Sequence, residues 1–221
     1  NYYVEFMKKQ IFAYLNPPIT SKVLPMYWYL GYNVHSKSVL EIGGVILASW
    51  IVPIHENYDG LDYWCTCMFG EDNPGDPYLI PTDRAVLDRR RKMILGPILE
   101  KAVKAGNIVI PEEFEAGFDH VTNLVRGLGM EDDPNYYLTR GYPGSVNTYV
   151  FNSISTPDNN SYPPTNEETF IGYMHLSMFY NQAQLAEEYP ADKYPFLAEK
   201  FAFVQKYLKD KYQIDLEAIA N

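Results

Sequence analysis

The segment from Leu40 to Ile54, LEIGGVILASWIVPI, is the most apolar stretch of the chain and constrains its fold more than any other feature. As a helix it would reach only about 22 Å, whereas the hydrocarbon layer of a bilayer is about 30 Å thick. Its length therefore favours a buried core helix or strand. A short membrane-embedded helix is the alternative, because aromatic residues flank the segment on its N-terminal side.

Four residues of this segment are candidates for contact with a partner. Gly44 and Ala48 form a small-xxx-small pair, which would let two helices approach closely. Trp50 would lie among the aromatic residues of a membrane interface. Glu41 is best interpreted as an ordinary first-turn residue, although a carboxylate inside a membrane would be functional. We therefore expect Glu41, Gly44, Ala48 and Trp50 to contact other subunits or the lipid bilayer.

The net charge of −10 excludes one large class of partner. Residues 1–54 hold four Lys/Arg against two Asp/Glu, while the remaining residues hold 14 against 26. Phosphate neutralisation by basic side chains drives nucleic-acid binding, and this chain has no such excess. We expect protein subunits as partners, with no nucleic acid.

Helical spacing of apolar residues and proline or glycine boundaries predict a mainly α protein of about five to six helices. The predicted domains are 1–37, an N-terminal helix and aromatic linker; 38–54, the apolar helix; and 55–221, an acidic helical domain. The individual helices are expected at 2–15, 82–105, 111–126, 166–188 and 195–212. Pro97 should kink or split the second of these.

Two long segments, 55–81 and 130–165, lack helical periodicity and are rich in tyrosine and proline. Compact domains seldom keep structureless loops beyond about 12–15 residues. Such segments are usually lids, binding loops or chain that lies on a partner. Their aromatic content predicts that they pack against other molecules.

One polar cluster has the side-chain types of a metal site. It comprises His55, Glu56, Asp59, Asp62, Cys65 and Cys67, of which His55, Asp59, Cys65 and Cys67 are the best ligand candidates. Zinc sites usually combine two Cys-x2-4-Cys units, and this spacing differs. Turn carboxylates beside two packed thiols are the favoured interpretation, so we predict no metal and no cofactor.

Catalytic motifs are absent from the sequence. There is no phosphate-binding glycine loop, no His-Glu-x-x-His and no Gly-x-Ser-x-Gly. A motif-less enzyme would use scattered residues such as Asp59, Asp62, His120 and Arg140. His120 and His175 are each expected to be structural, and the basic run 89–92 is expected to lie on a solvated helix.

These observations favour a non-catalytic accessory subunit of a larger, membrane-associated assembly, of respiratory or ATP-synthase type, that wraps partners with its extended segments. The mitochondrial inner membrane is the corresponding location. Two alternatives stay open: a soluble enzyme without a local motif, and an extracellular or periplasmic binding module. A glycosylation sequon at Asn159 would suit the last of these.

Overall fold

A computed structural model describes residues 2–31, 34–53, 57–59, 62–67, 84–127, 129–143, 145–146, 154–155 and 162–220. The chain forms two compact units. Unit 1 comprises Asn1–Ile11 and Leu24–Leu95, and unit 2 comprises Phe12–Val23 and Gly96–Asn221. The domain boundaries predicted from the sequence stay a prediction.

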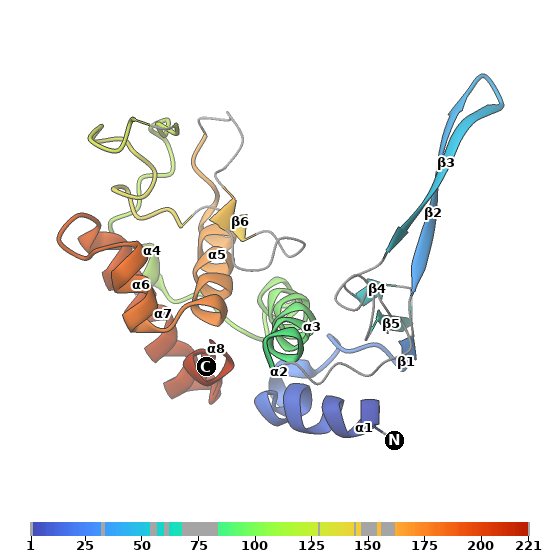
Figure 1. The fold of residues 1–221 in the computed structure, drawn as a ribbon. Helices are drawn as coiled ribbons and strands as arrows, with labels where there is room; N and C mark the ends of the chain where they lie inside the picture. Colours follow the sequence, from blue (N-terminus) through green and yellow to red (C-terminus); the bar gives the residue numbers. More distant parts are fainter. Residues whose placement is uncertain are drawn as a thin grey trace. The chain divides into compact units, whose positions relative to one another are not determined.

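Unit 1 combines a helical N-terminus with short strands (Figure 1). The helical part is α1 (Tyr2–Phe6) followed by a π-helical turn, η1 (Met7–Ile11). A three-stranded sheet has the order β1-β5-β4, with β1 (Tyr27–Gly31) parallel and β4 (Asn57–Asp59) antiparallel to the central β5 (Tyr63–Cys67). The buried Trp64 ring meets Trp28 edge to face at a centroid distance of 5.3 Å, which anchors this sheet.

The apolar segment is not a helix, so the prediction of a mainly α fold with an apolar helix is wrong. It forms a β-hairpin of β2 (His35–Ile42) and β3 (Val45–Pro53), seen as two strands side by side in Figure 1. The fold is mixed, because the described residues form both helices and strands. None of the helices in the described ranges is long and apolar enough to cross a membrane.

Unit 2 is helical. It contains a 3-10 turn, η2 (Phe12–Tyr14), and the helices α2 (Pro17–Thr20), α4 (Glu112–Glu115), α5 (Asn166–Phe179), α6 (Gln182–Glu188), α7 (Pro195–Tyr212) and α8 (Leu216–Ala220), with short strands β6 (Ser145–Val146) and β7 (Ile154–Ser155). The central helix α5 packs against α7 and α8. Its core includes the fully buried Phe114, Phe170, Tyr173 and Phe201.

Helix α3 (Arg84–Lys104) contributes its residues up to Leu95 to unit 1 and the rest to unit 2. It confirms the helix expected at 82–105, and Pro97 does not split it.

The basic run 89–92 within α3 was expected to be solvated, which is wrong: Arg90, Arg91 and Lys92 are buried. Burial lowers the pKa of Lys92, and the neighbouring Arg91 lowers it further.

The other helix predictions have mixed outcomes. Helix α7 confirms the expectation at 195–212. The helix expected at 166–188 is interrupted between α5 and α6, where Asn181 caps the second helix with its side chain. The helix expected at 111–126 is wrong, since only α4 forms there. Gly117 adopts a φ of 92°, a left-handed conformation that ends the turn.

Candidate functional site

The β2–β3 hairpin is the most unusual surface of the described chain. Every residue from Val39 to Ile51 is exposed. Its large exposed apolar residues are Val39 (45%), Leu40 (47%), Ile42 (63%), Val45 (60%), Ile46 (58%), Leu47 (58%), Trp50 (50%) and Ile51 (70%). Soluble proteins rarely expose a contiguous apolar patch of this kind, and such patches mark interaction sites.

The tip of the hairpin is a tight two-residue turn. Gly43 and Gly44 have φ values of 61° and 79°, so both occupy the left-handed region. This is the requirement of a type I′ turn, whose twist matches that of the flanking strands. The register shifts between Leu40 and Glu41, because Leu47 is an extra residue in β3. The two glycines and the bulge therefore fix one register between β2 and β3.

The hairpin has little to stabilise it in water. Its strands of eight and nine residues extend for about 26 to 30 Å, and among the described residues they pair only with each other. An isolated two-stranded hairpin is marginally stable at best, unless an apolar face is covered. A surface other than the hairpin itself is therefore needed to cover its apolar residues.

The structure places the four expected interaction residues on this hairpin, although not on a helix. Gly44 lies in the turn, and Ala48 lies opposite Leu40 in β3. Gly44 and Ala48 thus form no helical packing face. Trp50 lies opposite Ser38, and Glu41 lies opposite Ile46. Whether these residues contact a partner stays a prediction.

The expected metal ligands are only partly described. His55 and Glu56 lie outside the described residues, and of Asp59 and Cys67 only the backbone is described. In β5, Cys65 is half-buried and pairs in register with Tyr58, while Asp59 pairs with Trp64. No group of three His, Cys, Asp or Glu side chains gathers in the described parts of the chain.

Two of the four residues suggested for a motif-less enzyme come together in unit 2. Arg140 donates to the backbone carbonyl of Asp119 at 2.7 Å and to its carboxylate at 3.2 Å. His120 lies beside Tyr142, with ring centroids 5.9 Å apart. Asp62 lies in unit 1. His120 and Arg140 therefore share one neighbourhood within unit 2.

The interactions of this neighbourhood are structural. Hydrogen bonds from Thr122 and from the Val121 backbone hold the pKa of Asp119 well below its usual range. Burial raises the pKa of Tyr142 to about 12, and its hydroxyl donates to the Asp119 carbonyl at 2.8 Å. His120 Nδ1 lies 2.8 Å from the Pro164 carbonyl oxygen. The bonds to the Asp119 carboxylate hold residues 119–122 in a local turn, and the bonds of Tyr142 and Pro164 tie this turn to two other segments of unit 2.

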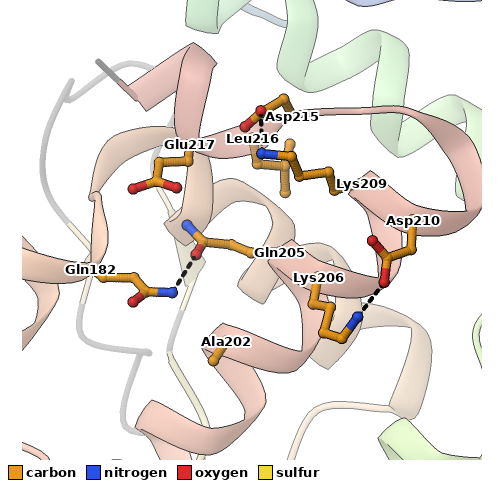
Figure 2. A pocket seen from close by; sticks show the side chains of 9 residues that line it. All are labelled: Gln182, Ala202, Gln205, Lys206, Lys209, Asp210, Asp215, Leu216 and Glu217. Atoms are coloured by element: carbon orange, nitrogen blue, oxygen red, sulfur yellow. Dashed lines mark hydrogen bonds and ion pairs between the residues drawn. The ribbon is translucent and has the colours of Figure 1, made fainter.

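A shallow pocket lies between α6, α7 and α8 (Figure 2). Lys206 pairs with Asp210, and Lys209 pairs with Asp215 at 2.7 Å. The amide of Gln182 donates to Gln205 at 3.4 Å. Asp210 and Asp215 match the two lysines of the lining, and Glu217 adds one further carboxylate, so the pocket offers little concentrated charge to a ligand.

Lys200 is the most unusual charged residue of unit 2, and it was not among the residues predicted to be functional. Its ammonium group lies within 6 Å of four phenylalanine rings, those of Phe114, Phe118, Phe196 and Phe203. The residue is 3% exposed and donates to the carbonyls of Glu113 and Ala116. A signal existed: Lys200 follows Leu197 by three residues and precedes Val204 by four, so it lies on the apolar side of its helix.

Comparison of the chain with protein family models, with curated proteins and with solved structures finds no match.

Proposed function

We propose that this chain is a non-catalytic accessory subunit of a larger protein assembly, which it joins through the β2–β3 hairpin. The observation that carries the proposal is the exposure of every residue from Val39 to Ile51 in a hairpin that pairs only with itself among the described residues. A surface of this composition is stable in a cell when another molecule covers it. A membrane-associated location for the assembly stays part of the proposal.

The proposal relies on the hairpin rather than on the connecting segments. In the described part of the second segment, Tyr136, Tyr137, Leu138 and Tyr142 are all buried. The Val125 and Tyr137 backbones bond to each other at 3.1 Å, which ties this segment to its own unit. A segment that buries its aromatic residues on its own chain has less to offer a partner.

The test shortens the hairpin without disturbing its base. Lys37 and Ile51 face each other in register, so an Asn-Gly turn in place of Ser38–Trp50 can join them. The tagged full chain is expressed in its source cells, and the size of its native particle is measured by gel filtration. The control is Val121→Ser, which removes an 87% exposed apolar side chain from outside the hairpin.

We expect the full chain and the control to elute within a larger particle, and the shortened chain to elute alone with unchanged helical circular dichroism. A full chain that elutes alone contradicts the proposal. Retention of the shortened chain in the particle also contradicts it.

A further inference from the structure

The hairpin has two unlike faces, because residues paired across the strands point to the same side and alternate along each strand. The register puts Leu40, Ile42, Val45, Ala48 and Trp50 on one side, together with Ser38. We name this side the apolar face. The opposite side, the charged face, holds Val39, Ile46, Ser49 and Ile51 and the ionisable residues His35, Lys37 and Glu41.

The charge pattern indicates which face is covered. Lys37 lies opposite Ile51 and Glu41 lies opposite Ile46, so a partner lying on the charged face would have to remove an ammonium and a carboxylate from water. That removal costs several kcal/mol for each charge without a matching partner. The apolar face carries no charge from Ser38 to Trp50, and covering it with apolar surface is favourable.

The backbone excludes hydrocarbon as the covering medium. A two-stranded hairpin has two outer edges, each with N–H and C=O groups that face away from the other strand. Lipid tails cannot bond these groups, which is why only helices and closed barrels occur in the hydrocarbon layer. On a protein surface, a hairpin covered on one face keeps its edges in water or beside polar groups of the partner.

Charge also disfavours a second copy of this chain as the occupant. Each chain carries a net charge of −10, and two such chains repel each other as they approach. Residues 55–221 alone hold 14 Lys/Arg against 26 Asp/Glu. The partner as a whole is therefore expected to be neutral or basic, which is the complementary net charge.

We infer that the apolar face of the hairpin inserts into an apolar groove of a protein of different sequence and of neutral or basic net charge, while the charged face stays in water. This inference rests on the proposed function and adds the face, the chemistry and the kind of partner. Trp50 is the expected anchor, because tryptophan side chains are prominent among the residues that dominate binding energy.

The test compares two pairs of substitutions with closely matched positions. Leu40→Ser with Trp50→Ser changes the apolar face, at 47% and 50% exposure. Val39→Ser with Ile51→Ser changes the charged face, at 45% and 70% exposure, and each replaced residue is a chain neighbour of one in the first pair. We expect the first pair to lower the affinity of the chain for its assembly at least about a hundredfold, and the second pair to lower it by less than about fivefold.

Photo-crosslinking identifies the occupant. A benzophenone amino acid at position 42 should form a crosslink to an uncharged segment of one protein of different sequence, and the same group at position 41 should not. Flotation of the purified chain with vesicles of phosphatidylcholine and phosphatidylserine, or a dimer in sedimentation equilibrium that the apolar-face pair abolishes, would overturn the inference.

The outcomes separate the two proposals. The shortened hairpin decides whether the hairpin joins the chain to an assembly at all. If shortening releases the chain and both substitution pairs weaken assembly equally, then the proposed function survives and the one-sided insertion is wrong.

Discussion

The buried ammonium group of Lys200 gives a prediction whose size follows from the structure. The change is Lys200→Met, which keeps an unbranched apolar side chain and removes only the charged end. Lys200 Nζ donates to the carbonyl of Ala116, the residue just after α4, at 2.7 Å, and to the carbonyl of Glu113, within α4, at 3.3 Å. Helix ends leave such carbonyls without intrahelical partners, and a cation there is favourable.

The expected loss combines three contributions. A hydrogen bond from a charged donor contributes about 1.5 to 3 kcal/mol, and the longer bond to Glu113 contributes less. Attraction between the ammonium and the phenylalanine rings, the nearest centroid of which is 5.1 Å away, contributes about 0.5 to 2 kcal/mol. The third contribution has the opposite sign: the methionine carries no charge, so the unfavourable burial of charge that lowers the pKa of Lys200 is removed. We expect a net loss of about 2 to 3 kcal/mol.

The assay is chemical denaturation followed by far-ultraviolet circular dichroism, with thermal unfolding alongside. For a chain of this length, the expected loss lowers Tm by about 4 to 12 °C. The control is Lys206→Met on the same helix, where the lysine is 76% exposed and pairs with Asp210. Exposed pairs contribute about 0 to 1 kcal/mol. If the two variants unfold within about 0.5 kcal/mol of each other, then Lys200 does not anchor α4 as argued.

Three further variants test packing and pH dependence. Gly141→Ala should lower the free energy of unfolding by about 3 kcal/mol and Gly106→Ala by about 1 kcal/mol. Both glycines have a φ of 77°, but only the methyl group added at Gly141 would overlap the Phe196 ring. Equal losses for the two variants in urea denaturation would show that the ring moves aside. His175 is buried, with Nε2 at 3.8 Å from the Glu100 carboxylate, and burial lowers its pKa although Glu100 raises it. Its neutral form is favoured on folding, so its stabilising contribution is complete above about pH 6.5 and is lost as the pH falls toward the lower folded pKa. Between pH 7.5 and 5.5, the free energy of unfolding of the unchanged chain should fall by up to about 1.4 kcal/mol more than that of the His175→Gln variant. Identical profiles of unfolding free energy against pH for the two proteins would contradict this.

The error in the apolar segment has a clear physical cause. A short apolar run does not distinguish a buried helix from a strand by periodicity, and the Gly44–Ala48 spacing suited a helix equally well. The decisive signal was local: Gly43-Gly44 between two runs rich in β-branched residues is a hairpin sequence. In a helix the same glycines would have been destabilising. Turn chemistry therefore specified this element better than hydrophobicity did.

Other parts of the fold depended on contacts that no local pattern contains. The apolar spacing of Phe114, Phe118 and Val121 predicted one helix face, yet Val121 is 87% exposed. Phe118 meets the Phe196 ring at a centroid distance of 4.9 Å, and that ring also occupies the space beside Gly117. A distant helix thus determines where this chain segment turns. By contrast, α3 and α7 were predictable because their boundaries are local.

The hairpin also carries features that oppose indiscriminate pairing. Lys37 and Glu41 place charge along β2, the bulge at Leu47 interrupts the edge of β3, and Pro53 ends that strand without an N–H group. Charges, bulges and prolines are the usual means of preventing edge-to-edge aggregation. These features protect the edges and leave the apolar face unprotected. A hairpin with protected edges and an uncovered apolar face suits the proposed partner, which covers that face with a groove and adds no strand to either edge.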